Sequence, residues 1–212
     1  MNSMLTQPDD LTVYLIDDDE VVLHSQVELL TAAGRKVSAY RSAEAFLSAL
    51  TPQIAGCIVT DLKLSGMSGL DLQRRLVAAG SQLPLIVVSG HANVPTTVEL
   101  MENGAVTLLQ KPYEARELLE AVERAIDQFI ENRDRTLQLI SIRKRLDSLS
   151  HEEMSVLELM IAGRPNKVIS TELDISMRTV DRRRSIVLEK MQVDSAPELA
   201  RLVTLLEATP PT

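Results

Sequence analysis

The sequence contains acidic, hydroxyl and basic residues of the types that phosphoryl chemistry requires. They are the acidic run Asp17-Asp18-Asp19, then Asp61, Ser89 and Lys111. Carboxylates brought together repel one another and stay ionised only if a cation joins them, and Mg²⁺ with oxygen ligands meets that need. Beside such an ion a carboxylate is a competent nucleophile toward a phosphoryl group, and a lysine and a serine hydroxyl can hold the transferred oxygens. We therefore predict a phosphoryl site if the fold brings these residues together.

The elements around these residues are predicted to bring them together. The continuously apolar run Val13–Ile16 is typical of a strand buried on both faces of a parallel sheet. Helical patterns alternate with it and with four further expected strands, at 36–40, 57–60, 85–88 and 106–109. Five such units predict an α/β fold with a doubly wound, five-stranded parallel sheet. Its ligands bind beyond the carboxyl ends of the strands, where Asp17, Asp61, Ser89 and Lys111 lie.

Each of these residues has an ordinary structural explanation when taken alone. A single aspartate after a strand is usually a helix cap, and we expect Asp19 to be one. A lone serine or lysine would be equally unremarkable. Suitable residues at the ends of four strands form a pattern that chance explains poorly.

The rest of the chain is predicted to be entirely helical. A polar stretch at 129–147 is expected to be a helical linker that could also mediate dimer contacts. Ser150–Glu153 is a capping-box pattern, and Ser195–Glu198 is a second one. Gly163 is expected to end one helix, and Asn166 to start the next. We therefore expect a small all-α domain at 148–212.

Two helices of this domain have the pattern of a helix-turn-helix. The first is expected at 166–174, and Ser176 can cap a second that runs to about Met191. A buried stripe of Val180, Val187, Leu188 and Met191 would leave positions 178, 181, 182 and 185 facing outward, where a recognition helix meets the major groove.

The side chains on that outward surface suit DNA, although a simpler reading exists. Arg182 could read guanine, while Arg183 and Arg184 suit phosphates. Asp181 could accept a hydrogen bond from the amino group of cytosine, or it could repel phosphate and thereby restrict which DNA sites are bound. The simpler reading is that an arginine run is only a solvated helix face.

Composition limits the class of protein. The net charge is −8, but residues 1–128 hold 17 acidic and 9 basic residues, so the acidic excess lies outside the helical domain. DNA responds to the local patch, so the sign of the whole chain does not exclude a DNA partner. A single cysteine excludes a disulfide framework, and no signal peptide or membrane span is visible. We expect a soluble cytoplasmic protein without a membrane partner.

Several segments resemble the receiver domain of two-component response regulators: Val13–Glu20, Val59–Gly69, Val87–His91 and Gln110–Tyr113. The resemblance implies a flavodoxin-like receiver at 1–128 in which a sensor histidine kinase phosphorylates Asp61. It also implies that Asp18, Asp61 and the carbonyl of Lys63 ligate Mg²⁺, with Asp17 acting through water. Lys111, before an expected cis proline, would pair with the phosphoryl group, and Ser89 would be the switch hydroxyl.

Two positions depart from the receiver pattern. Leu108 stands where the family usually has an aromatic residue, which calls the usual coupling between the serine and that aromatic residue into question. Ser65 replaces a common proline, and we expect this to loosen its loop slightly with little functional effect.

The stretch Leu149–Met191 resembles the LuxR-type effector of NarL/FixJ-class regulators, most clearly at Gly163–Ile169 and Ile175–Val180. The resemblance implies a four-helix DNA-binding domain whose last helix is a dimerisation surface. The predicted DNA-binding residues are Asn166, Lys167, Arg178, Thr179, Asp181, Arg182, Arg183, Arg184, Ser185 and Lys190.

The function expected from both resemblances is phosphorylation-dependent regulation of transcription, not enzymatic turnover. The implied partners are the kinase, double-stranded DNA, RNA polymerase and a second copy of the chain when phosphorylated. Two alternatives stay open at this point. The helix-turn-helix could contact only protein in a phosphotransfer module, or the Asp61 cluster could belong to a phosphohydrolase.

Overall fold

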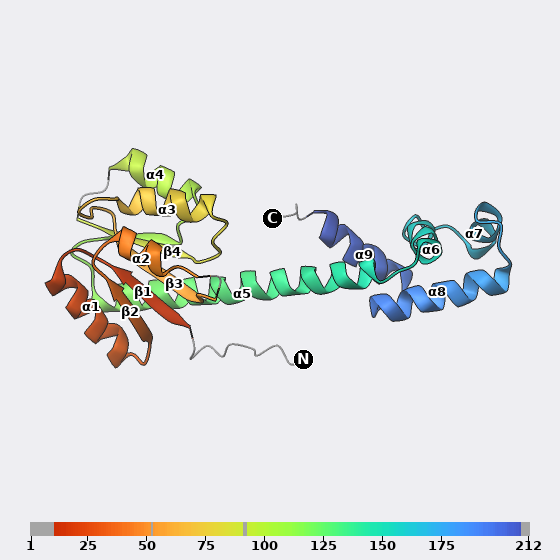
Figure 1. Cartoon of the computed structure of the whole chain (residues 1–212), viewed down its shortest axis with the longest axis horizontal. Coiled ribbons are helices and arrows are strands. Elements are labelled where there is room, and N and C mark those ends of the chain that lie inside the picture. Colours follow the sequence, from red (N-terminus) through yellow and green to blue (C-terminus); the bar gives the residue numbers. More distant parts are fainter. Residues whose placement is uncertain (1–10, 52, 91–92, 209–212) are drawn as a thin grey trace. The chain divides into compact units, whose positions relative to one another are not determined.

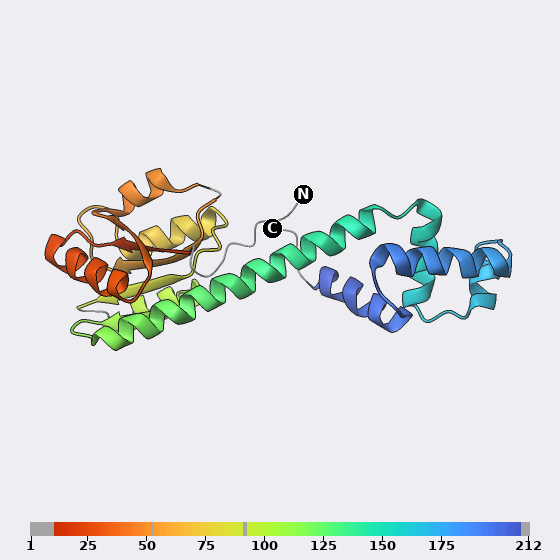
Figure 2. The same ribbon diagram turned by 90° about the horizontal axis from the view of Figure 1, so that it is seen from below.

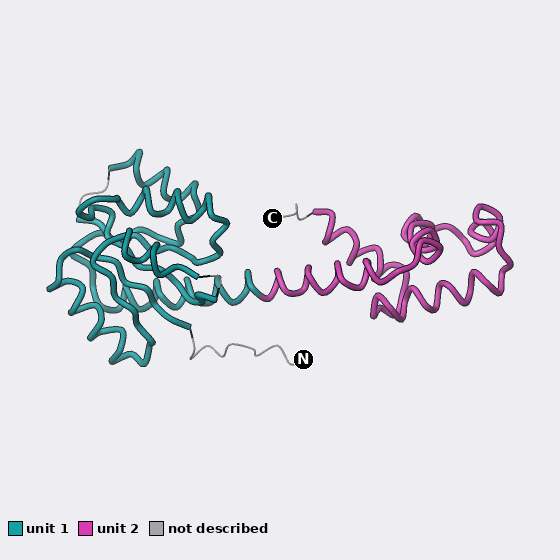
Figure 3. The backbone as a smooth tube through the Cα atoms, viewed as in Figure 1, with its two compact units in different colours: residues 1–133 teal, residues 134–212 magenta. Residues whose placement is uncertain are grey.

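A computed structural model describes residues 11–51, 53–90 and 93–208 of the chain. The chain divides into two compact units, residues 1–133 and residues 134–212 (Figure 3).

The first unit is built on the predicted parallel sheet. Its strands are β1 (Thr12–Ile16), β2 (Lys36–Tyr40), β3 (Gly56–Asp61), β4 (Leu85–Ser89) and β5 (Thr107–Gln110). They pair in the order β2-β1-β3-β4-β5, all parallel, and this confirms the predicted doubly wound fold (Figure 1).

Helices cover both faces of this sheet. They are α1 (Glu20–Ala32), α2 (Ala43–Ala49), α3 (Gly69–Ala78), α4 (Val94–Glu102) and the start of α5 (Ala115–Asp147). Val13 and Leu15 of β1 pack with α1 and α5, whereas Tyr14 and Ile16 pack with α2, α3 and α4 (Figures 1 and 2). Successive residues of a strand point to opposite faces, so β1 needs apolar residues at every position.

The second unit has a helical core of its own. Besides the end of α5 it contains α6 (His151–Ile161), α7 (Asn166–Glu172), α8 (Met177–Met191) and α9 (Ala196–Glu207). Val156, Ile169, Val180, Val187 and Leu199 are fully buried in its core.

The predicted helix caps are largely confirmed. Ser150 and Glu153 form the full capping box, and Ser176 accepts the N–H of Thr179. The second capping box, expected at the start of α9, forms only one of its two hydrogen bonds. Ser195 accepts the N–H of Glu198, but the Glu198 carboxylate accepts the N–H of Asp194 instead of that of Ser195.

The expected linker at 129–147 is part of α5. Phe129 packs in the core of the first unit, while Ile142 is buried in the core of the second. The two units meet in the sequence between Arg133 and Asp134, so each end of the expected linker contributes to a core. Among the described residues, no helix has the length and apolar character needed to cross a bilayer.

Candidate phosphoacceptor site and DNA-binding surface

The carboxyl edge of the sheet brings together two of the predicted carboxylates and the predicted lysine. Lys111 Nζ lies 3.2 Å from Asp17 Oδ2 and 2.5 Å from Asp61 Oδ2. The side chain of Asp17 is 3% exposed, that of Asp61 13% and that of Lys111 26%. Two nearly buried carboxylates therefore share one cation that still reaches solvent.

The ends of the strands and the start of α3 set this geometry. Asp61 ends β3, Asp17 directly follows β1 and Lys111 directly follows β5. The Lys111 N–H donates to the carbonyl of Ser89 at 2.8 Å, and the Lys111–Pro112 bond is cis, as predicted. Gly69 begins α3 against Asp61, where a Cβ would lie only 2.5 Å from the Asp61 carbonyl oxygen. The glycine therefore lets α3 start close to the strand end.

Burial and pairing shift the pKa values in this pocket. Burial raises the pKa of Asp17, although the N–H of Asp19 and the charge of Lys111 act against it. Burial by itself would lower the pKa of Lys111, but its contacts with Asp61 and Asp17 outweigh burial and raise that pKa. The lysine therefore stays charged and compensates carboxylates that are costly to bury.

The pocket has the donor chemistry that Mg²⁺ requires, since Asp17 and Asp61 supply carboxylate oxygens. Asp17 Oδ1 also accepts the N–H of Asp19 at 3.0 Å, and Asp61 Oδ1 accepts the N–H of Lys63 at 2.8 Å. Within the described ranges, no group of three or more His, Cys, Asp or Glu side chains is arranged to hold a metal ion. The expected ligand roles of Asp18 and of the Lys63 carbonyl therefore stay predictions.

The third predicted carboxylate, Asp18, contacts Ser65. Asp18 Oδ2 accepts the Ser65 N–H at 2.9 Å and also the Ser65 hydroxyl. The hydroxyl is the largest cause of a lowered pKa at Asp18. Sequence reasoning treated Ser65 as a minor loosening of its loop and missed these contacts. One feature of the sequence pointed to such a contact: serine has a backbone N–H, which the proline common at this position lacks and which can donate to a carboxylate.

Three further residues considered in the sequence lie in or beside the strands and α1. Ser89 ends β4 and is fully buried. Leu108 is partly buried in β5 and packs with the core on the side of α2, α3 and α4. Asp19 caps α1 by accepting the N–H groups of Val21 and Val22, as expected.

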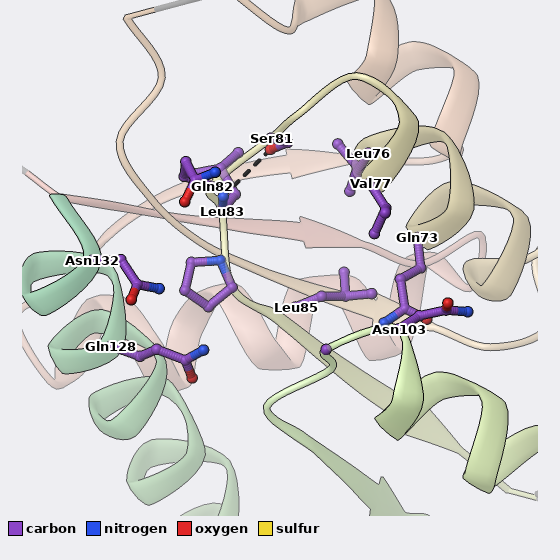
Figure 4. A pocket seen from close by; sticks show the side chains of 12 residues that line it. Gln73, Leu76, Val77, Ser81, Gln82, Leu83, Leu85, Asn103, Gln128 and Asn132 are labelled. Atoms are coloured by element: carbon purple, nitrogen blue, oxygen red, sulfur yellow. Dashed lines mark hydrogen bonds between the residues drawn. The ribbon is translucent and has the colours of Figure 1, made fainter. Parts of the chain in front are cut away.

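A cavity of about 140 Å³ lies at another place in the first unit (Figure 4). It is lined by uncharged residues that include Gln73, Gln82, Asn103 and Gln128. None of the predicted site residues lines it, so it is separate from the aspartate pocket.

In the second unit, α8 presents the expected polar surface. Val180, Val187 and Met191 are fully buried and Leu188 is partly buried, so the predicted stripe faces the core. Of the predicted DNA-binding residues in 178–185, Arg178, Asp181, Arg182 and Ser185 are exposed, whereas Thr179, Arg183 and Arg184 are partly exposed. The arginines of α8 are therefore accessible to a partner.

Several predicted DNA contacts have partners inside the domain, and two of these interactions join different helices. Asn166 Nδ2, at the start of α7, donates to Asp181 Oδ1 on α8 at 2.7 Å. Lys190 Nζ lies 2.6 Å from Glu153 Oε2 and also donates to a backbone carbonyl. The charge of Lys190 is thus compensated, whereas Lys167 is exposed on α7. The sequence signalled neither contact, because the partners come from different helices.

Comparisons with known proteins cover both units. The family model of the response regulator receiver domain matches residues 13–123, and that of the bacterial regulatory proteins of the luxR family matches residues 147–203. Transcriptional regulatory protein FixJ of Azorhizobium caulinodans is 39% identical over 96% of this chain and 96% of that protein. Response regulator protein TodT of Pseudomonas putida is 35% identical over 92% of this chain and 86% of that protein. Among solved structures, response regulator StyR aligns with a TM-score of 0.81 and 35% identity, over 91% of this chain and 98% of that one.

The fold, the aspartate–lysine pocket and the helix-turn-helix thus define a two-component regulator of transcription and not an enzyme. The chain belongs to the NarL/FixJ class of response regulators, in which a receiver domain is joined to a LuxR-type DNA-binding domain. This confirms the predicted family and general function. Membership implies a kinase partner and binding to DNA.

Proposed function

We propose that Asp61 is the residue that accepts the phosphoryl group from a sensor histidine kinase. The carboxylate of Asp61 would attack phosphorus, so that an O–P bond forms while the N–P bond of the kinase phosphohistidine breaks and the imidazole leaves. The single observation that carries this proposal is Lys111, whose ammonium lies 2.5 Å from Asp61 and can pair with the transferred oxygens. Mg²⁺, when bound, would neutralise charge on the phosphoryl oxygens. We place it beside Asp17, Asp18, Asp61 and the carbonyl of Lys63.

Replacement of the acceptor tests this assignment. Asp61→Asn should abolish labelling by acetyl [³²P]phosphate in the presence of Mg²⁺, because an amide is not a nucleophile toward phosphorus under these conditions. Asp127→Asn, at an exposed position of α5, is the matched control and should label like the wild type. Label that persists in Asp61→Asn would show that another residue is the acceptor.

Phosphorylation is proposed to act on the surface formed by α4, β5 and α5. Ser89 would follow the phosphoryl group, and the change would favour a homodimer. The exposed apolar side chains of α4 support a dimer surface there, since Val94 is 76% exposed, Val98 48% and Met101 46%. Analytical ultracentrifugation with and without beryllofluoride and Mg²⁺ measures this change, and Val98→Glu should prevent dimerisation without preventing phosphorylation.

The second unit is proposed to bind double-stranded DNA through α8. Arg178, Arg182 and Ser185 are exposed on one side of the helix and would meet base edges, as would Thr179. Arg183, Arg184 and Lys167 suit phosphates. The contact between Asn166 and Asp181 supports a different role for that aspartate, which would orient Asn166 toward the DNA. Lys190 is expected to contribute little because Glu153 compensates its charge.

A footprint on the promoter of its own gene, measured with the beryllofluoride form, tests DNA binding. Arg182→Ala should remove the footprint, whereas Arg75→Ala makes the same change of charge at an exposed position of α3 and should retain it. The affinity should fall steeply with salt, since each phosphate contact releases a counterion. The absence of any footprint would favour the alternative that the helix-turn-helix contacts protein. In the proposed function, dimers that are phosphorylated by the kinase bind DNA and act on RNA polymerase in the cytoplasm.

A further inference from the structure

Ser65 makes two contacts with one oxygen atom of Asp18. Its backbone N–H donates to Asp18 Oδ2 at 2.9 Å, and its hydroxyl donates to the same oxygen. The two residues are 47 positions apart in the sequence, so the fold and not local chain geometry brings them together. An exposed serine that uses both of its donors on one carboxylate oxygen is placed to control where that carboxylate points.

The loop that carries Ser65 is itself held from the other side. Glu44 Oε1, on α2, accepts the N–H of Met67 at 2.9 Å. Gly66, between these two residues, has a φ of +103°, and a Cβ there would lie 3.0 Å from the same carboxylate of Glu44. The position of Ser65 beside Asp18 therefore follows from the path of an anchored loop.

Asp18 does not converge with the other two carboxylates in this arrangement. Asp17 and Asp61 share Lys111, but no third acidic side chain of the described chain joins them in a group that could hold a metal ion. An oxygen that accepts two hydrogen bonds has less electron density to offer a cation, and its side chain must give up those bonds to reorient.

We propose that Ser65 is a positioning residue that holds Asp18 away from Asp17 and Asp61 and thereby weakens binding of the divalent cation. This inference rests on the proposed function, in which that cation assists phosphorylation of Asp61. The cation must compete with Ser65 for Asp18, so the receiver would require more Mg²⁺ than one without these two donors. Substitutions at Ser65 should change that Mg²⁺ requirement while every proposed ligand residue is kept.

Isothermal titration calorimetry of the full chain with Mg²⁺ alone tests the proposal. Ser65→Ala removes the hydroxyl and should lower the Kd about threefold to tenfold, the range that corresponds to the net free energy of an ordinary hydrogen bond, because Ser65 is exposed and solvent weakens its bond to the carboxylate. Ser65→Pro removes both donors and should lower the Kd at least as much. Ser65→Thr keeps both donors and should bind like the wild type, as should Ser48→Ala, whose hydroxyl bonds only within α2.

The outcomes separate this proposal from the function on which it rests. A Kd that is unchanged or higher in Ser65→Ala, with the wild type binding Mg²⁺ and labelled at Asp61, overturns the role of Ser65 alone. An equal change in Ser65→Thr also overturns it, because the two donors would then not be the cause. Failure of every protein, the wild type included, to bind Mg²⁺ overturns both the proposed cation and the role of Ser65. Urea unfolding of each variant distinguishes a change in the site from a general loss of stability.

Discussion

Replacement of Lys111 by methionine would leave two nearly buried carboxylates without their shared cation. Methionine keeps most of the length and apolar volume of the lysine stem, so the charge is the main loss. Removal of one partner of a buried ion pair costs about 3 to 5 kcal/mol. Lys111 is 26% exposed, so solvent screens part of the interaction, and about 2 kcal/mol is the expected loss for the first unit.

Tyrosine fluorescence during urea unfolding can follow the first unit selectively. The chain has three tyrosines and no tryptophan, and Tyr14, Tyr40 and Tyr113 all lie in that unit. With a urea dependence of about 2 kcal/mol per molar, the expected loss lowers the midpoint by about 1 M in EDTA at neutral pH. Lys36→Met, at an exposed residue of β2, is the matched control and should unfold like the wild type.

The difference in urea midpoint between Lys111→Met and the wild type should depend on pH with a definite sign. Pairing raises the pKa of Lys111 above its ordinary value of 10.5, so its stabilising effect is present below that pH and is lost as the pH rises through the raised value. At acid pH, burial raises the pKa of Asp17 above its ordinary value. As the pH falls, Asp17 therefore takes up a proton sooner than an exposed aspartate would, and this removes the charge that Lys111→Met leaves uncompensated. The gap between Lys111→Met and wild type should therefore narrow as the pH falls toward the pKa of Asp17. Equal midpoints at neutral pH in EDTA would refute the argument that Lys111 stabilises this pocket.

Three further predictions concern single positions in the two units. Glu153→Gln should lower the free energy of unfolding of the second unit by about 0.5 kcal/mol, because the amide can still accept the capping N–H but loses the charge that pairs with the Lys190 ammonium. Thermal melting by circular dichroism measures the loss. Gly69→Ala should sharply reduce acetyl-phosphate labelling, because its Cβ would displace the strand end that carries the acceptor, whereas Gly90→Ala has open space and should label normally. Cys57, whose pKa burial raises to about 12, should resist iodoacetamide near pH 8 in the folded chain and react in urea.

Each of these predictions has a result that would contradict it. An unchanged melting curve for Glu153→Gln would mean that the charge of this carboxylate contributes nothing measurable. Normal labelling of Gly69→Ala would mean that the start of α3 can move without affecting the strand end. Rapid alkylation of Cys57 near pH 8 without urea would mean that the first unit opens readily, because this cysteine is fully buried in β3.

Prediction from the sequence succeeded where the determining interactions are local or follow from strand order. The apolar run of β1 indicated burial on both faces because each residue faces one of two helical layers. Ser150 and Ser176 were recognised as caps because each bonds a backbone N–H three residues along the chain. The convergence of Asp17, Asp61 and Lys111 was predictable because parallel strands end at a common edge.

Prediction failed where a side chain chooses a partner from another element. Glu198 bonds Asp194 and not the cap residue, which the capping-box pattern alone did not distinguish. The contacts of Lys190 with Glu153 and of Asn166 with Asp181 join neighbouring helices and were not predicted, whereas the DNA-binding roles of Lys190 and Asn166 stay predictions. Such contacts depend on how helices pack, and a sequence pattern along one helix carries no information on that packing.

The sequence by itself determined the two folded units, the α/β order, the acidic pocket with its lysine and the exposed arginines of α8. Strand burial, helix caps and the common edge of a parallel sheet are properties that residue type and spacing specify. Only the tertiary structure decided where Asp18 points, since Ser65 reaches it from a loop that is anchored elsewhere. A carboxylate can rotate toward several donors within reach, and the packed fold determines which of them is there.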